Sequence, residues 1–289
     1  MTRSPASSQT SGPRLLFSID LEEFYPARAG RNPQSTTLPD LVDSYLQLFN
    51  EARYHATFFV VGEVARKYPQ TLRLISAAGH ELGCHGDQHR TLNSFTPRSF
   101  KEDLRSNRRA VEDAAGQPVH GFRAPLLSLV EATSWAHGAL QEEGFTYSSS
   151  VFPDRNPLFG WPGFGDSPRQ RDGVWELPVN PLRVPLLGRL PLFCGTYFRV
   201  LPWWFNRRML PTARDPLLSY FHPYDIDHRQ PWIMHAGVKG RPWLNLLLFV
   251  RRRSLPRRIA SLLEACSAGG TYHSFVKNQL ESSNPAKIQ

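Results

Sequence analysis

Short apolar runs alternate with helical segments along the first half of the chain, and this alternation constrains the fold more than any other feature. The runs predict strands at residues 15–19, 56–61, 81–84, 119–122 and 145–151. Helices are expected between them, over about 41–49, 71–78, 96–115 and 131–143. Repeated strand and helix units of this length favour a parallel sheet with covering helices, either open or closed into a barrel.

The second half departs from this repeat. Residues 153–191 contain eight prolines, which indicates a loop-rich insertion. An apolar strand returns at 217–221, and a long helix is expected over 243–265, interrupted or kinked at Pro256.

These patterns predict a single domain, and 289 residues with 40% hydrophobic side chains can form one core without a disulfide or a metal. The domain is expected over residues 14–289, after a disordered leader at 1–13. Within it, the insertion is placed at 153–213 and a C-terminal helical extension at 243–280.

Charge and cysteine content narrow the class of protein. The excess of 34 basic over 25 acidic residues would suit nucleic acid or an anionic membrane, but no nucleic-acid motif accompanies it, so no nucleic-acid partner is expected. The three cysteines form no CxxC pair, which suits a reducing compartment and argues against a cysteine zinc site. No apolar run reaches the length of a membrane span, and we expect a cytoplasmic protein.

Reactive side chains follow the predicted strands at the point where each strand ends. Asp20, His85, Arg123 and His222 each lie at the carboxyl end of an apolar run or one residue beyond it. Enzymes with barrels or open α/β sheets place their catalytic groups at this edge. The four positions therefore predict one site at the mouth of the sheet.

The residue types at this mouth suit a metal. In an extended chain Asp20 and Glu22 point to one side, while Glu23 points away. His85 and His89 are four residues apart and can converge on one ion. Two histidines and one carboxylate complete the protein ligands of a catalytic zinc site. Taken singly, the segments also fit an acidic helix start and two surface histidines.

Arg123 and His222 add a fixed cation and a proton donor. An arginine can hold a carboxylate ionised, although the same pair also occurs as an ordinary structural ion pair. An imidazole at the strand end can donate a proton to a leaving group.

The order of these residues resembles the polysaccharide deacetylase family, the NodB-homology domain of carbohydrate esterase family 4. The resemblance covers about residues 15–222, and its motifs are ATFF at 56–59, AGHE at 78–81, HxxxH at 85–89 and FRAP at 122–125. GTYFR at 195–199 and HPYDID at 222–227 further resemble the branch found in exopolysaccharide-biosynthesis loci.

The resemblance implies a distorted (β/α) barrel of about seven strands that binds one divalent metal, expected to be zinc. It implies Asp20 as general base, Arg123 as its orienting residue, His222 as general acid, Glu22, His85 and His89 as metal ligands, and the backbone N–H of Leu126 as an oxyanion donor. Trp175, with three other tryptophans, is a candidate platform for sugar rings or an anchor for the proline-rich loops.

Several positions depart from the family pattern. Glu22 follows Asp20 after one intervening residue, where the family has adjacent aspartates. Gly86 and Leu126 replace a hydroxyl residue and an aromatic one. Serines at 148–150 stand where relatives place an aspartate, which leaves the partner of His222 open between Glu176 and Asp225.

The expected activity is that of a metal-dependent hydrolase of carbon–nitrogen bonds other than peptide bonds, which removes N-acetyl groups from a sugar or glycan during surface polysaccharide biosynthesis. One alternative is hydrolysis of a formyl amide, cyclic imide or ureide on the same barrel. Another is a catalytically inactive relative that binds a glycan or a membrane.

The expected partner is a glycan or a lipid-linked sugar. Five arginines near the C-terminus suggest contact with the anionic inner membrane surface or with a lipid-linked pyrophosphate, although a solvated helix face is the simpler interpretation. They are Arg251, Arg252, Arg253, Arg257 and Arg258.

Overall fold

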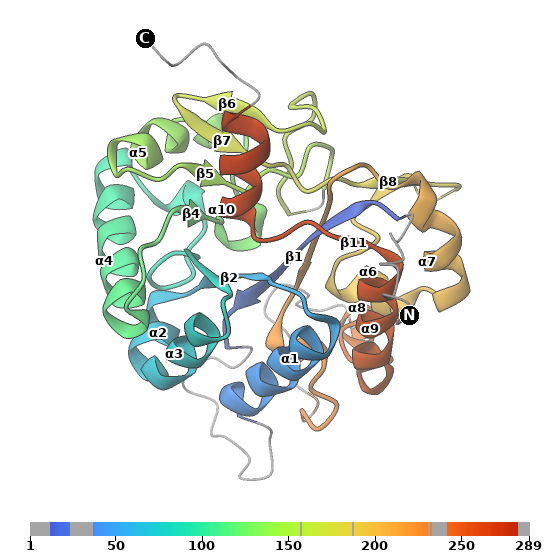
Figure 1. Ribbon diagram of the computed structural model, residues 1–289. Helices are drawn as coiled ribbons and strands as arrows, with labels where there is room; N and C mark the ends of the chain where they lie inside the picture. Colours follow the sequence, from blue (N-terminus) through green and yellow to red (C-terminus); the bar gives the residue numbers. More distant parts are fainter. Residues whose placement is uncertain are drawn as a thin grey trace, which may run out of the picture.

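The computed structural model has a mixed α/β fold in which helices surround one large sheet (Figure 1). The structure describes residues 12–23, 37–156, 158–186, 188–230, 232 and 242–282, so most of the predicted leader lies outside the described residues. Seven strands run parallel in the order β10-β1-β2-β3-β4-β5-β7. The antiparallel β6 extends the β7 edge, and β11 pairs in parallel with the start of β1. The expected α/β class with a parallel sheet is confirmed.

The strands are β1 (Arg14–Leu21), β2 (Thr57–Val60), β3 (Glu81–Cys84), β4 (Gly121–Phe122), β5 (Tyr147–Ser148), β6 (Arg169–Arg171), β7 (Val174–Glu176), β10 (Leu217–Phe221) and β11 (Ser267–Ala268), with a separate hairpin of β8 (Leu182–Val184) and β9 (Gly188–Leu190). The helices are α1 (Leu38–Ala52), α2 (Gly62–Lys67), α3 (Pro69–Ala77), α4 (Pro97–Ala115), α5 (Ala136–Glu142), α6 (Gly195–Val200), α7 (Trp203–Met209), α8 (Pro242–Leu247), α9 (Leu255–Ala265) and α10 (Tyr272–Phe275). Among the described helices, none is long and apolar enough to cross a bilayer.

A side chain, rather than a strand pairing, connects β7 to β10 on the described part of the sheet. Asn180 follows β7 and is buried. Its Nδ2 donates to the carbonyl oxygen of Pro216 at 2.9 Å, and its Oδ1 accepts from the amide of Leu218 at 3.1 Å. The chain after β7 is thereby held against β10, the strand at the other end of the parallel order.

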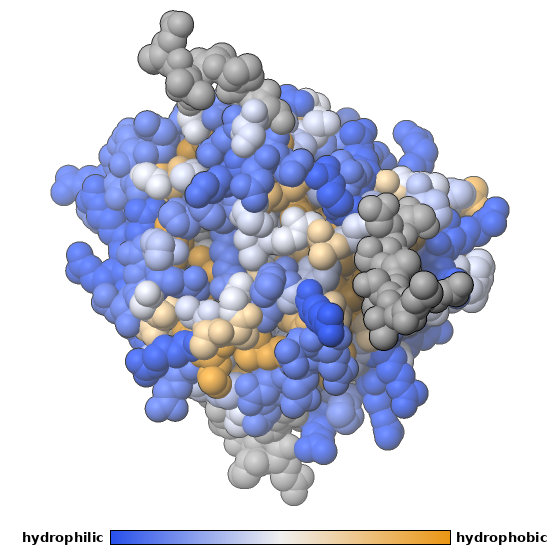
Figure 2. Space-filling model, viewed as in Figure 1, coloured by the Kyte–Doolittle hydropathy of each residue, from blue (hydrophilic) through white to orange (hydrophobic). Residues whose placement is uncertain are grey.

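The two faces of the sheet have different cores. Residues such as Phe58 and Val60 face the surrounding helices, whereas Phe59 and Tyr147 point inward and pack against Tyr272 of α10. Figure 2 shows that side chains on the outside of the helices are mostly hydrophilic on the face it presents. The parallel strands therefore carry apolar residues on both faces, which explains their continuous apolar runs.

Glycine on β4 makes room for one of the inner rings. A Cβ built on Gly121 would lie 2.0 Å from Cζ of Tyr147. We expect Gly121→Ala to lower the free energy of unfolding by about 2 kcal/mol, because the ring must shift within a packed core. Chemical denaturation measures this. Gly138→Ala in α5 is the matched control and should raise stability by about 0.5–1 kcal/mol, because the methyl group meets no close contact. Equal effects of the two substitutions would contradict the prediction.

Capping residues set both ends of α4. Thr96 accepts a hydrogen bond from the amide of Ser99, Pro97 is the first helical residue of α4, and Gly116 ends the helix at φ 69°. The segment expected as one helix over 131–143 forms a short 3-10 turn followed by α5 instead.

The helix expected over 243–265 is interrupted, as one of the two alternatives predicted, but the break comes before Pro256. The chain forms α8 and α9 separately, with a 3-10 turn at Arg252–Ser254 between them. Pro256 lies in the first turn of α9, where its missing amide removes no intrahelical hydrogen bond. It therefore helps to begin a helix and does not kink one.

Two of the five arginines expected on a membrane-facing surface instead donate hydrogen bonds to backbone carbonyls of the protein. For these two, the expected membrane contact is wrong. Arg252 is buried and donates to the carbonyl oxygens of Leu248 and Asp227. Arg258 donates to three carbonyl oxygens in and just after α6. Both guanidinium groups satisfy backbone acceptors. Arg251, Arg253 and Arg257 remain exposed.

His80 lies in the core beside Phe49 and Phe58. Its Nδ1 accepts from the amide of Ala56 at 3.0 Å, and burial, with a smaller contribution from His55, lowers its pKa to about 4. The unfolded chain takes up this proton near pH 6.5, whereas the folded protein does so only near pH 4.

We therefore expect the free energy of unfolding to fall as the pH drops from 6.5 to 4, with about 3 kcal/mol of the loss due to His80. Denaturation curves across this range, compared with those of His80→Asn, isolate that share because asparagine can accept the hydrogen bond without titrating. The exposed His228→Asn is the control and should retain the wild-type pH dependence. An unchanged pH dependence in His80→Asn would contradict the assignment.

Candidate active site

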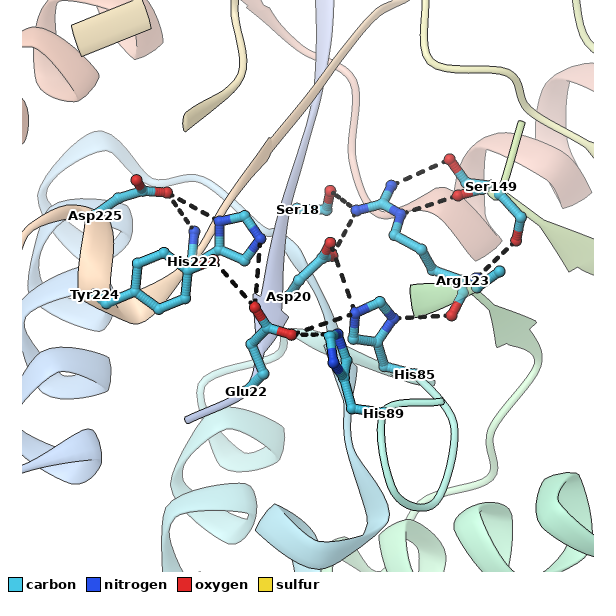
Figure 3. Close-up of polar contacts among 12 residues, drawn as sticks. Ser18, Asp20, Glu22, His85, His89, Arg123, Ser149, His222, Tyr224 and Asp225 are labelled. Atoms are coloured by element: carbon cyan, nitrogen blue, oxygen red, sulfur yellow. Dashed lines mark hydrogen bonds and ion pairs between the residues drawn. The ribbon is translucent and has the colours of Figure 1, made fainter. Parts of the chain in front are cut away.

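Three side chains from two strand ends form a cluster suited to a metal ion. Glu22 follows β1, His85 follows β3, and His89 lies on the loop after His85. One ligand atom from each can be chosen so that all lie within 4.8 Å of one another. His85 Nε2 lies 3.9 Å from Glu22 Oε2, and His89 Nε2 contacts the same oxygen directly (Figure 3). The structure thus brings together the three predicted ligands.

Hydrogen bonding prepares His85 to act as a ligand. Its Nδ1 lies 2.8 Å from the carbonyl oxygen of Arg123, so Nδ1–H donates and the Nε2 lone pair faces the cluster. Burial lowers the pKa of His85 to about 4, which keeps the imidazole neutral at pH 7. A neutral imidazole held by a backbone carbonyl is the usual arrangement of a metal-binding histidine.

The donor set fits a divalent cation. Glu22 Oε2 is buried without a hydrogen bond of regular geometry, although it faces two imidazoles. Burial alone would raise the pKa of Glu22, but His89, with His222 and His85, holds it well below its ordinary value. The carboxylate therefore stays ionised. One anionic oxygen and two imidazole nitrogens match a catalytic zinc site.

Backbone conformation explains one departure from the family pattern. Gly86 has φ 75° and His89 has φ 53°, both in the left-handed region. A residue with a β-carbon is strained there, so glycine after His85 allows the tight loop that returns His89 to Glu22. The loop is also anchored by Asp103, whose Oδ2 accepts from the amide of Asp87 at 3.0 Å.

Asp20 and Arg123 form a buried ion pair, with Arg123 Nη1 2.7 Å from Asp20 Oδ1. The same arginine donates to Ser18 Oγ, to the carbonyl and hydroxyl oxygens of Ser149, and to the Tyr272 hydroxyl. This network fixes Asp20, whose Oδ2 lies 3.9 Å from His85 Nε2. Arg123 thus orients a carboxylate at the edge of the metal cluster.

His222 completes the cluster from β10. Its Nε2 lies 3.7 Å from Glu22 Oε1, and its Nδ1 lies 3.1 Å from Asp225 Oδ2. Burial opposes its protonation, but Asp225 and Glu22 together raise the pKa of His222 to about 9. At pH 7 it is an imidazolium that can donate a proton.

The two candidate partners of His222 are now distinguished. Asp225 contacts its ring, whereas Glu176 accepts from the amides of Ser150 and Val151 and contacts His137. Glu176 therefore holds the backbone after β5 and has a structural position.

Sequence reasoning did not identify Tyr224, Ser18 or Ser149 as contributors to the site. Tyr224 donates to Glu22 Oε1 at 3.0 Å, and its ring stacks on His222 at 4.6 Å. Ser18 and Ser149 hold Arg123 from either side. Tyr224 lies within the HPYDID motif, which was a usable signal, whereas the two serines carry none.

The remaining predicted positions lie around this cluster. Glu23 points away, as expected, toward Lys67 and Tyr68. Leu126 has φ 57° in the 3-10 turn after Arg123. The hydrogen bonds of this turn are donated by the amides of Leu127 and Ser128, and not by the amide of Leu126. Trp175 is partly buried against the inner aromatic cluster of Tyr147 and Tyr272, a position that supports the anchoring alternative over a sugar platform.

Comparison with known proteins divides the chain into two matched regions. Residues 32–147 match the family described as polysaccharide deacetylase, and residues 149–271 match a domain of unknown function, DUF3473. Asp20 and Glu22 lie before the first region. His222 and Asp225 lie in the second.

Curated relatives match part of the chain. It is 27% identical over 106 residues to a peptidoglycan deacetylase of Helicobacter pylori, which covers 37% of this chain and 35% of that protein. It is 34% identical over 98 residues to a chitooligosaccharide deacetylase of a Bradyrhizobium species, with 33% and 42% covered. For a chitooligosaccharide deacetylase of Sinorhizobium fredii the identity is 31% over 124 residues, with 43% and 51% covered. The matches thus span a third to a half of these relatives.

Solved structures share the fold over almost the whole chain. A polysaccharide deacetylase structure from Mycobacterium smegmatis superposes with a TM-score of 0.61 at 19% identity and covers 98% of this chain and 96% of its own. A CE4-family pseudoenzyme from Bacillus anthracis superposes with a TM-score of 0.53 at 12% identity and covers 92% and 66%. At these identities the similarity concerns the fold.

Proposed function

We propose that this chain is a metal-dependent hydrolase that removes N-acetyl groups from a sugar or glycan. The match of residues 32–147 to the polysaccharide deacetylase family, and the similarity to curated deacetylases, support this proposal. The observation that supports this most directly is the convergence of the Glu22, His85 and His89 cluster with a fixed carboxylate and an imidazolium. These are a metal site, a base and an acid in one place.

The residues divide the reaction between them. A metal ion held by Glu22, His85 and His89, which we propose to be zinc, would polarise the acetyl carbonyl and lower the pKa of the attacking water. Asp20 accepts a proton as the water oxygen bonds to the acetyl carbon. The carbon–nitrogen bond breaks, His222 gives its Nε2 proton to the amine, and acetate and a free amino sugar leave. The Leu126 amide is assigned to the oxygen that carries the developing charge.

A product assay tests this function. Purified protein, assayed for bound metal by mass spectrometry, is incubated with N-acetylated and N-formylated amino-sugar oligomers of chitin and peptidoglycan type. Release of acetate, with a matching gain of free amines, is expected. Release of formate alone would favour the second hydrolase class. Metal-loaded protein without turnover on any substrate would favour an inactive, binding relative.

The setting of this activity is a further part of the proposal. We place the enzyme in the cytoplasm, acting in surface polysaccharide assembly on a glycan or lipid-linked sugar, because its motifs at 195–199 and 222–227 resemble that branch. Arg251, Arg253 and Arg257 are exposed and follow α8 along the chain, where Trp243 and Leu246 are also exposed, and these side chains support contact with an anionic inner membrane surface. Flotation with phosphatidylglycerol vesicles, but not with phosphatidylcholine vesicles, would be expected. No flotation with either would overturn it.

A further inference from the structure

The region of unknown function contributes buried charges directly behind His222. Arg199 of α6, His222 and Asp225 all lie between residues 149 and 271. We propose that Arg199 and Asp225 are positioning residues that hold the His222 imidazole for proton donation, so that this region is the acid half of the active site. This inference deepens the proposed function and rests on it.

Asp225 contacts His222 at two atoms, the backbone amide and the ring Nδ1. Its Oδ2 accepts from the His222 backbone amide at 2.8 Å and lies 3.1 Å from Nδ1 of the ring (Figure 3). Asp225 is 1% exposed, so water does not compete for these contacts. A proton on Nδ1 that is donated to Asp225 leaves Nε2 to carry the proton that is transferred.

Arg199 supplies the positive charge that compensates the buried carboxylate of Asp225. Its Nη2 lies 3.0 Å from Asp225 Oδ1, and its side chain is fully buried. It is anchored by the carbonyl oxygen of Val250 at 2.9 Å and by Thr196 Oγ1 at 3.2 Å. Burial would raise the pKa of Asp225, but Arg199 and His222 hold it at about 2. Without Arg199, the carboxylate would be a buried, poorly compensated charge.

The surroundings leave His222 little freedom. Tyr45 of α1 donates to its carbonyl oxygen at 3.1 Å, and the Tyr224 ring covers one face of the imidazole. Gly195, at the start of α6, has φ 25°, and a Cβ there would lie 3.0 Å from Asp225 Oδ2. Glycine at this position therefore allows α6 to approach Asp225.

The same device occurs on the base side of the site. Arg123 holds Asp20 from one direction, and Arg199 holds Asp225 behind His222 from another. β1 and β10 are paired in parallel register with Ile19 opposite Phe221, so the base and the acid leave neighbouring strands at the same level. The serine hydroxyls after β5 have other partners, because Ser149 Oγ accepts from Arg123 and Ser150 Oγ accepts from the amide of Ala124.

The experiment compares two leaving groups. An amine must be protonated to leave, whereas the 4-nitrophenolate of an aryl acetate leaves unaided. We expect Asp225→Asn and Arg199→Met to lower kcat on an N-acetylated oligosaccharide by about 100-fold, with KM and metal content unchanged, and to lower aryl acetate hydrolysis less than about threefold. Arg199→Lys should restore part of the amide activity.

Arg258→Met is the matched control, because Arg258 braces α6 through backbone carbonyls and does not contact Asp225. It should lower thermal stability while changing hydrolysis of both substrates by the same factor. If Asp225→Asn and Arg199→Met also lower both activities in parallel, or lower neither, the positioning role is overturned.

Imidazole nitrogen NMR gives a readout that does not depend on turnover. Wild-type protein should show a slowly exchanging His222 Nδ1–H that is lost in Asp225→Asn. If this signal is present in a protein that hydrolyses no amide, the proposed function fails while the positioning stands. If the signal is absent from wild-type protein, the positioning fails whatever the activity.

Discussion

Replacing Glu22 by glutamine is expected to abolish metal binding at the proposed site and to lower the proposed deacetylation by about a thousandfold. Glu22 is the one anionic member of the described cluster, and His85, His89, His222 and Tyr224 all face it. An amide of the same shape cannot neutralise a divalent cation and its NH₂ group would face two imidazoles. Metal content by mass spectrometry and acetate release measure the two effects.

Glu23→Gln is the matched control for this prediction. Glu23 is the adjacent carboxylate, but it contacts Lys67 and Tyr68 on the other side of the chain. Its replacement should leave metal content and turnover at the wild-type level. If Glu22→Gln keeps stoichiometric metal and wild-type turnover, the assignment of Glu22 as a metal ligand is wrong.

The site residues were predictable because parallel strands impose a simple geometry. Asp20, His85 and His222 each follow an apolar run, and the carboxyl ends of parallel strands meet at one edge of a sheet. The order of strands was not needed to bring these positions together. The predicted ligand set therefore agrees with the cluster that the structure forms.

The supporting residues were not predictable, because their partners are distant in sequence. Ser18 contacts Arg123 across 105 positions, and Tyr272 contacts it across 149. A serine on a strand is compatible with packing, catalysis or neither, and only the tertiary fold brings it to a guanidinium group. The buried position of Arg199 was equally unpredictable, since a single arginine in a helix usually faces solvent.

The errors near the C-terminus have a related cause. A proline in an apolar helical pattern is compatible with a kink or with a first turn, and the break before α9 decides between them. Likewise, five arginines look like one surface by charge alone. Arg252 and Arg258 instead donate hydrogen bonds to backbone carbonyls, most of which belong to other segments.

The two matched regions meet at the site, which bears on how each is interpreted. The two histidines of the proposed metal site belong to residues 32–147, whereas His222, Asp225 and Arg199 belong to residues 149–271. Tyr224 of the second region donates to Glu22, the proposed metal ligand. Neither region contains all the groups that the proposed chemistry requires, so an isolated fragment of either one should lack amide hydrolysis.

Asp20→Asn is expected to lower turnover by about a thousandfold while the metal is retained, because the asparagine cannot accept a proton from water and the three ligands are intact. It should also destabilise the fold by about 3 kcal/mol, since Arg123 loses the partner of a fully buried charge. Asp215→Asn is the control: Asp215 pairs with the partly exposed Arg14, so its loss should cost less than about 1 kcal/mol and leave turnover unchanged. Activity, metal content and denaturation of the same samples separate the two effects. A folded, metal-loaded Asp20→Asn with wild-type turnover would show that the base lies elsewhere.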